Sequence, residues 1–126
     1  TAVLIGKGSC DPYNPKVVRS TMGAIFRVPF VMCDELPGTV EELRRSGVVV
    51  YGAHLDGDDL YDIEFPDMVA FLIGNEGNGL TDEVACRADR LLRIPMEGKV
   101  ESLNAAISAT LLSYEVMRQR RRDRQN

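Results

Sequence analysis

The residues best suited to binding a ligand or taking part in a reaction lie in a glycine-rich run, Gly74-Asn75-Glu76-Gly77-Asn78-Gly79-Leu80. It follows residues 69–73, a continuously apolar run typical of a strand that is buried on both faces. Glycines permit positive φ angles and let a ligand approach the bare main chain. The spacing matches neither the dinucleotide fingerprint nor the phosphate-binding P-loop. We therefore expect a ligand-binding loop at the carboxyl end of a strand.

A second polar segment lies further along the chain. It reads Ile94-Pro95-Met96-Glu97-Gly98, and after three residues Ser102-Leu103-Asn104. Ser102 occupies the position expected for the N-cap of a helix. Beyond it, apolar residues recur at helical spacing and predict one apolar stripe facing a sheet. The stripe comprises Leu103, Ile107, Leu111, Tyr114 and either Val116 or Met117. Small residues fill the other positions of 105–110, which would allow another backbone to approach closely on a second face; they are Ala105, Ala106, Ser108, Ala109 and Thr110.

Together the two segments resemble motifs of the SpoU/TrmH family, which are RNA 2′-O-ribose methyltransferases of the SPOUT superfamily. The matching residues are Leu72 to Leu80, Ile94-Pro95-Met96 with Gly98, Ser102-Leu103-Asn104, and Tyr114-Glu115. Residues 16–24 also resemble the first internal helix of the family, so that the resemblance covers about residues 1–120. The first family motif, Asn-x-Gly followed by an arginine, has no match, and we expect it upstream of Thr1.

The resemblance implies transfer of a methyl group from S-adenosylmethionine to a ribose 2′-hydroxyl of ribosomal or transfer RNA. It also implies a homodimer and a C-terminal trefoil knot, which is a rare feature among folds. The cofactor would lie on main-chain groups and on an apolar bed. The implied cofactor-binding residues are Leu72, Gly74, Asn75, Gly77, Ile94, Met96, Ser102 and Leu103. Leu72 and Ile94 also fit an ordinary role in the core.

The resemblance assigns catalytic or loop-shaping roles to Glu76, Ser102 and Asn104. Each has a simpler interpretation: a glutamate bonded to loop amides, an N-cap serine, and an asparagine in a first helical turn. Arg19 lies in the first predicted helix and Arg27 at its end, and both could contact RNA phosphates, but neither matches the arginine that the family uses as a base. We therefore expect this chain alone to bind cofactor weakly and to turn over slowly.

Composition limits the function classes. With 126 residues and 44% hydrophobic content, the chain can form one globular domain, and we expect residues 1–126 to be an N-terminally incomplete SpoU-type methyltransferase domain. No run approaches the roughly 18 apolar residues of a membrane span. Three widely spaced cysteines and the lack of a signal peptide predict a cytoplasmic protein with reduced thiols, and no cluster predicts a metal site.

The charges are unevenly distributed around a net charge of −4. The C-terminal end is basic and either is a solvated helix end or contacts RNA; it contains Arg118, Arg120, Arg121, Arg122 and Arg124. The middle is acidic and is predicted to be a solvated loop, because it lacks the ligand spacing of a calcium loop; it contains Asp56, Asp58, Asp59, Asp62, Glu64 and Asp67.

The order of the expected elements predicts an α/β fold. Strands are expected at residues 2–5, 30–33, 48–53, 68–73 and 91–94, and helices at residues 14–26, 39–46, 81–88 and from 102 onward. A capping box at residues 39–42 starts the second helix, and Gly23 within the first suggests close packing. This alternation indicates a mostly parallel sheet with helices on both faces.

Two other functions remain open from the sequence. The first is a non-catalytic RNA- or cofactor-binding module, because the arginine expected as the base is absent. The second is an unrelated α/β nucleotide-binding domain, which leaves the paired motifs without a joint explanation.

Overall fold

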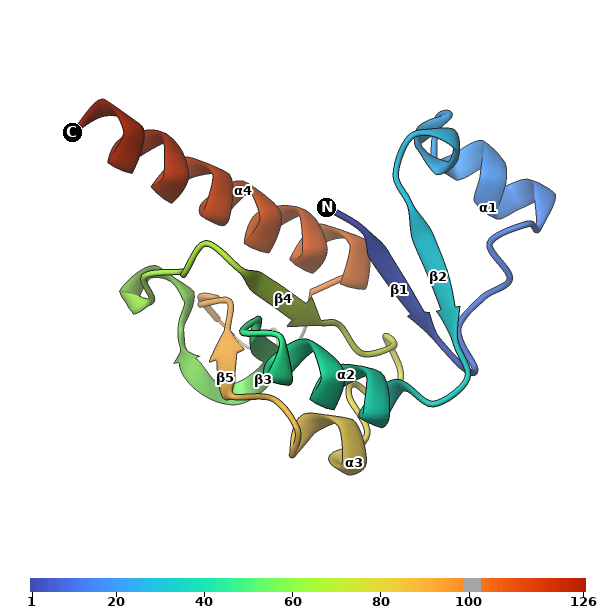
Figure 1. Ribbon diagram of the computed structural model, residues 1–126, viewed down its shortest axis with the longest axis horizontal. Coiled ribbons are helices and arrows are strands. Elements are labelled where there is room, and N and C mark those ends of the chain that lie inside the picture. Colours follow the sequence, from blue (N-terminus) through green and yellow to red (C-terminus); the bar gives the residue numbers. More distant parts are fainter. Residues whose placement is uncertain (99–102) are drawn as a thin grey trace. The chain divides into compact units, whose positions relative to one another are not determined.

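The computed structural model describes residues 1–98 and 103–126 (Figure 1). The elements in chain order are β1 (Val3–Gly6), α1 (Pro15–Ser20), the 3-10 helix η1 (Ala24–Phe26), β2 (Phe30–Cys33), α2 (Leu36–Arg45), β3 (Val49–Asp59), the 3-10 helix η2 (Leu60–Asp62), β4 (Val69–Leu72), α3 (Asp82–Ala85), β5 (Arg90–Arg93) and α4 (Ala105–Gln125). Main-chain contacts divide the chain into two compact units, Thr1–Thr39 and Val40–Asn126.

The first unit contains a two-stranded parallel sheet. β1 pairs with β2 from Val3 opposite Phe30 to Gly6 opposite Cys33. Both strands are partly open, because the side chains of Val3 on β1 and Val31 on β2 are 48% and 54% exposed. Two short strands have too few neighbours to cover both of their faces, which explains this exposure.

The first helix is shorter than predicted. The side chain of Asn14 accepts a hydrogen bond from the amide of Lys16 and Pro15 begins the helix, as expected, but α1 ends at Ser20 rather than near residue 26. Gly23 then adopts a φ of +84°, and a Cβ atom added there would meet no other atom within 4 Å, so Gly23 ends the helix by its conformation and not by close packing. A 3-10 turn follows it.

The second unit is built on a three-stranded parallel sheet in the order β4-β3-β5. Figure 1 shows α3 and α4 on opposite sides of this sheet. On the α4 side, Tyr51 packs with Leu92 and Leu112 in the main core cluster, while Gly52, the next residue along β3, lies against Leu80 and Ala88 beside α3. Alternating residues of one strand therefore contact the two helical layers, as expected for a parallel sheet. The predicted α/β class with parallel strands is confirmed, although the strands form two sheets.

β3 extends into the segment that was predicted to be an acidic loop. It continues to Asp59, and Leu92 pairs with both Ala53 and Asp58 across an irregularity in the ladder. The acidic strand end lies beside the arginines of β5, because Asp58 is 3.4 Å from Arg90 and Asp59 is 3.8 Å from Arg93. The sequence did not predict these ion pairs, because each aspartate or arginine taken by itself is typical of a solvent-exposed residue.

Two other helix boundaries differ from the prediction. α2 begins at Leu36, and the Thr39 hydroxyl donates to the carbonyl of Glu35, so Thr39 lies inside the helix and is not a capping residue. The Glu35 carboxylate instead accepts from the amide of Gly38. α3 starts with Thr81 as N-cap, as expected, but spans only Asp82–Ala85.

α4 begins later than predicted and buries a different face. Its N-cap is Asn104, whose side chain accepts from the amides of Ala106 and Ile107, whereas Ser102 lies outside the described residues. The buried positions of the helix are Leu112, Glu115, Val116 and Gln119. Most of the predicted stripe is exposed, with Ile107, Leu111, Tyr114 and Met117 at 37–63% exposure. The predicted core-facing stripe is therefore wrong apart from Val116, because two polar residues, Glu115 and Gln119, occupy the buried face.

Candidate functional site

The glycine-rich loop after β4 is shaped mainly by its own polar groups. The side-chain oxygen of Asn75 accepts from the amides of Gly77 and Asn78 at 2.9 and 2.7 Å, and its carbonyl accepts from the amide of Gly79. Asn75 and Gly79 also form an isolated antiparallel bridge. These bonds close the loop into a tight turn, and this gives Asn75 a structural role in the loop.

Two of the loop glycines are required by geometry. A Cβ atom on Gly74 would fall on the main chain of Gly79 and Leu80. Gly79 has a φ of +66°, which strains any other residue. Gly74 therefore lets the loop pack against itself, which differs from the expected role of admitting a ligand. Gly77 is less constrained, because the nearest neighbour of a Cβ there is the Asn75 side chain at 3.6 Å.

The structure brings together two of the three predicted catalytic residues. The amide nitrogen Nδ2 of Asn104 donates to Oε1 of Glu76 at 2.6 Å. Both side chains are exposed, so this pair is open to a ligand. The other end of the Asn104 side chain caps α4, which fixes the amide for its contact with Glu76. Ser102 is the third predicted residue and lies outside the described part of the chain.

The apolar residues predicted to hold the cofactor differ in exposure. Ile94, Met96 and Leu103 are half-buried, and Leu72 at the end of β4 is buried. Ile94 also packs against the main core cluster, which supports its alternative role as a core residue. Within residues 1–98 and 103–126, the main-chain groups of Met96, Glu97 and Gly98 form no hydrogen bond. Free main-chain groups beside half-buried apolar side chains suit the recognition of a heteroaromatic ring.

The predicted RNA contacts lie in the other unit. Arg19 is on α1 and Arg27 follows η1, and both are exposed. Within the described part of the chain neither arginine forms an ion pair.

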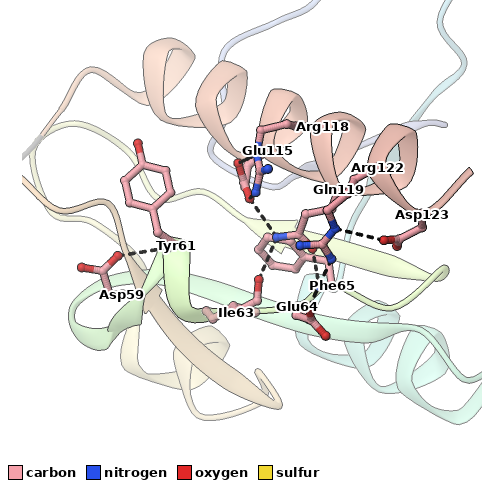
Figure 2. A network of polar contacts seen from close by, with 10 residues as sticks. All are labelled: Asp59, Tyr61, Ile63, Glu64, Phe65, Glu115, Arg118, Gln119, Arg122 and Asp123. Carbon is pink, nitrogen blue, oxygen red and sulfur yellow. Dashed lines mark hydrogen bonds and ion pairs between the residues drawn. The ribbon is translucent and has the colours of Figure 1, made fainter. Parts of the chain in front are cut away.

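A buried polar network anchors α4, and no pattern in the sequence indicated it directly (Figure 2). Gln119 donates to the carbonyl of Ile63 and accepts from the amide of Phe65, both at 2.8 Å, and also donates to Glu115. Glu115 forms two hydrogen bonds with Arg118 at 2.7 and 2.8 Å. Hydrogen bonding to Arg118 lowers the pKa of Glu115, although burial opposes the shift. The four-residue spacing of Glu115 and Gln119 on one helical face was the available signal.

A surface groove of about 750 Å³ runs along α4 and η2. Its lining includes Leu60, Tyr61, Leu111, Tyr114 and Met117, with Arg118, Arg121 and Arg122 also present. None of the predicted cofactor or catalytic residues lines it, so this groove is a separate feature of the second unit. Among the described residues, no group of three or more His, Cys, Asp or Glu side chains is placed to hold a metal ion. In the same part of the chain, no helix combines the length and hydropathy needed to span a bilayer.

Several known proteins are similar to this chain. One is the 23S rRNA (guanosine(2553)-2′-O)-methyltransferase RlmP of Bacillus subtilis, which is 38% identical over 116 residues, covering 91% of this chain and 46% of the relative. Another is the crystal structure of the SpoU methyltransferase AviRb from Streptomyces viridochromogenes in complex with AdoMet. It has a TM-score of 0.85 at 37% identity and covers 94% of this chain and 47% of that one.

A third similar structure is described as giving insights into 2′-OH methylation of C/U34 on tRNA. It has a TM-score of 0.84 at 30% identity, covering 94% of this chain and 78% of that one. This chain therefore spans about half the length of the curated relatives it matches. The model of the SpoU rRNA Methylase family matches residues 1–114. The chain belongs to the SpoU rRNA methylase family.

Proposed function

We propose that this chain forms the cofactor-binding part of an S-adenosylmethionine-dependent RNA 2′-O-methyltransferase acting on ribosomal or transfer RNA. Family membership and the names of similar proteins support the reaction class. The structural observation that carries the proposal is the hydrogen bond between Asn104 and Glu76, because it joins one polar residue from each of the two motif segments.

The chain's residues fit S-adenosylmethionine. The half-buried side chains of Ile94, Met96 and Leu103 offer an apolar bed for the adenine ring, and the main-chain groups of residues 96–98 offer hydrogen bonds to its edge. Leu72, Gly74, Asn75 and Gly77 shape the neighbouring loop, and Ser102 would complete the site. When bound, the cofactor supplies a methyl group activated by a positively charged sulfur.

Glu76 is proposed to orient the ribose. Its Oε1 atom accepts from Asn104, and its other carboxylate oxygen has no hydrogen-bond partner among the described residues. That oxygen could accept a hydrogen bond from the ribose 2′-hydroxyl and direct the lone pair of the nucleophile. Asn104 holds the carboxylate in place, and we assign Ser102 to the same constellation. Arg19 and Arg27 are proposed to contact RNA phosphates.

The assembly and threading of the chain are also proposals. The exposed residues Ile107, Leu111, Tyr114 and Met117 support a homodimer formed through α4, since such a row of apolar side chains is unusual on a free helix. Family membership supports a C-terminal trefoil knot and a single methyltransferase domain that includes both compact units. We place the protein in the cytoplasm, where ribosomal RNA is modified. Sedimentation of the purified chain tests the dimer.

Calorimetric titration with S-adenosylmethionine tests the cofactor. We expect saturable binding that is unchanged by the control Glu42→Gln, an exposed glutamate on α2. Incubation with unmodified 23S ribosomal and transfer RNA, followed by nuclease digestion and mass spectrometry, then tests for a new 2′-O-methyl group. Loss of this product in Glu76→Gln with retained cofactor binding would support the role of Glu76. Slow turnover is expected, because the arginine of the first family motif has no match in this chain. Binding with no product even after prolonged single-turnover incubation would favour the non-catalytic module, and no binding at all would overturn the proposal.

A further inference from the structure

We propose that the first unit binds an unpaired stretch of RNA whose bases stack on Phe26 and Tyr13. The surface concerned, called the α1–β2 surface, comprises Tyr13, Lys16, Arg19, Met22, Phe26 and Arg27. The inference deepens the proposed function and rests on it for the choice of RNA as the natural polyanion.

The α1–β2 surface exposes large side chains that normally avoid water. Phe26 is 83% exposed, Met22 86% and Tyr13 69%. The ring of Tyr13 packs against Phe30 with centroids 5.9 Å apart, and its amide is held by Asp11 at 2.9 Å. Tyr13 is therefore anchored on one side. A ring fixed in this way can receive a second flat group at little cost in conformational entropy.

Basic side chains outnumber acidic ones around these aromatic residues, and the carboxylate beside them, Asp11, is hydrogen-bonded to the amide of Tyr13. The chain has a net charge of −4, yet residues 12–33 contain Lys16, Arg19 and Arg27 and no aspartate or glutamate. In the second unit, by contrast, arginines such as Arg44, Arg90 and Arg118 form ion pairs with carboxylates. Within the described residues the three basic side chains of this surface have no ion-pair partner. This favours a polyanion over an uncharged protein surface.

A continuous series of tight turns holds the surface together. The amide of Met22 donates to the carbonyl of Arg19, the amide of Phe26 donates to that of Gly23, and the amide of Arg27 donates to that of Ala24. Met22 accepts a left-handed φ of +50° in this series, and it does so with its side chain in water. Two aromatic and three basic side chains thus lie within residues 13–27, and such a mixture suits a single strand, whose bases can stack and whose phosphates carry charge.

The RNA should be unpaired at this surface. In a duplex the faces of the bases stack on one another, and the deep, narrow major groove excludes side chains. Aromatic side chains bind bases that have left such a stack, and every base offers a flat face, so the recognition is tolerant of sequence. The α1–β2 surface therefore fits an RNA loop or a flexible single strand.

The test is fluorescence anisotropy of the full 126-residue chain with a labelled oligouridylate and with an RNA hairpin duplex, without cofactor. We expect Phe26→Leu to weaken oligouridylate binding by about 5- to 100-fold, because it keeps apolar bulk but removes the π face. Phe26→Trp should retain or strengthen binding. The matched control is Leu55→Ala, which truncates a residue that is 59% exposed on β3 and should have no effect.

The arginines give a second, independent measurement. Arg19→Ala and Arg27→Ala should each reduce the slope of log affinity against log salt by about 0.7, the value for one phosphate on a single strand. The control is Arg45→Ala, an exposed arginine on α2. Unchanged affinity in Phe26→Leu, or equally tight binding of the duplex, would overturn the inference. A change in sedimentation in place of RNA binding would instead identify a protein interface and would also overturn it.

Failure of this inference can be told apart from failure of the proposed function. The anisotropy experiment contains no methyl donor, so the absence of catalysis does not affect it. Conversely, a chain that methylates RNA but binds oligouridylate independently of Phe26 would retain the proposed function and lose only this surface.

Discussion

Asn104 and Glu76, 28 residues apart in the chain, are joined by a hydrogen bond of 2.6 Å between amide and carboxylate. The same asparagine uses its oxygen to cap α4 through the amides of Ala106 and Ile107. One side chain therefore fixes both the beginning of the last helix and the glycine-rich loop after β4. Because different atoms of the side chain make the two contacts, the contribution of Asn104 to stability can be measured separately from its contribution to activity.

Asn104→Asp and Asn104→Ala make that separation measurable. Aspartate still caps the helix, but its second oxygen would meet the Glu76 carboxylate and the two exposed charges repel. We therefore expect a loss of only about 0.5 kcal/mol in unfolding free energy and a methyl-transfer rate lower by about 10- to 100-fold. Alanine loses both functions and should also reduce the unfolding free energy by about 1 kcal/mol. Urea denaturation and single-turnover methylation measure the two quantities. Equal activity of the aspartate variant and wild type would contradict a role for this hydrogen bond.

Substitution of the loop glycines should have graded effects. Gly74→Ala places a methyl group on the main chain of Gly79 and Leu80, so we expect the loop to open and cofactor binding to be lost. Gly77→Ala is the matched control, since its methyl group meets only the side chain of Asn75 at 3.6 Å. Calorimetric titration of both variants with S-adenosylmethionine tests this order. Stronger damage from Gly77→Ala would mean that the loop changes shape when it binds.

Acid should destabilise the second unit in part through Glu115. Hydrogen bonding to Arg118 holds the pKa of Glu115 below its ordinary value of 4.5 in the folded state. The folded state is therefore stabilised above pH 4.5, and this stabilisation is lost as the pH falls through the lowered pKa. We expect Glu115→Gln to cost about 1 to 3 kcal/mol at neutral pH. The difference from wild type should shrink below pH 4.5.

Urea denaturation at several pH values provides the measurement for Glu115. The control is Glu64→Gln, because the Glu64 carboxylate also meets an arginine on α4 but is 84% exposed. Exposed ion pairs contribute at most about 1 kcal/mol, so this variant should show little change. A constant difference between Glu115→Gln and wild type down to about pH 3 would exclude the expected linkage.

Gln119→Leu should loosen the segment before β4. The substitution leaves the Phe65 amide and the Ile63 carbonyl without their partner, and we expect a loss of about 1 to 3 kcal/mol. Hydrogen exchange at Phe65 should become faster by a larger factor than at residues of β5. Gln125→Leu, at the exposed end of α4, is the control and should leave this exchange unchanged. Continued protection of the Phe65 amide in Gln119→Leu would show that other contacts hold this segment.

The strands were readily predicted from the sequence, because short apolar runs between breakers have few alternatives in an α/β chain. All five predicted strands are present in the structure, and the glycine-rich loop follows β4 as expected. What made these features predictable is that each depends on residues close together in the sequence. The motifs named Glu76 and Asn104 as candidate site residues, but they did not predict the hydrogen bond between the two side chains.

The features that the sequence did not predict depend on residues that are distant in the chain. β3 extends through Asp58 and Asp59 because Arg90 and Arg93 of β5 lie beside them. No local sequence pattern predicts these ion pairs between distant residues. The orientation of α4 depends on Gln119. Its buried side chain forms hydrogen bonds with the main chain of Ile63 and Phe65, where an exposed glutamine would bond to water. Both Ser102 and Asn104 are good capping types, so local propensity could not choose between them.

The irregular ladder of β3 has a consequence for the evolution of this chain. Leu92 pairs with Ala53 and again with Asp58, so that residues 54–57 bulge out of the sheet between two anchored stretches. Insertions or deletions within residues 54–57 would leave the pairs formed by Ala53 and Asp58 in register. A glycine must remain at the position of Gly57, because a Cβ atom there would clash with the main chain of Leu92. Homologues should accordingly tolerate insertions there and resist them between Tyr51 and Ala53, where a shift by one residue would turn the core-facing side chains outward.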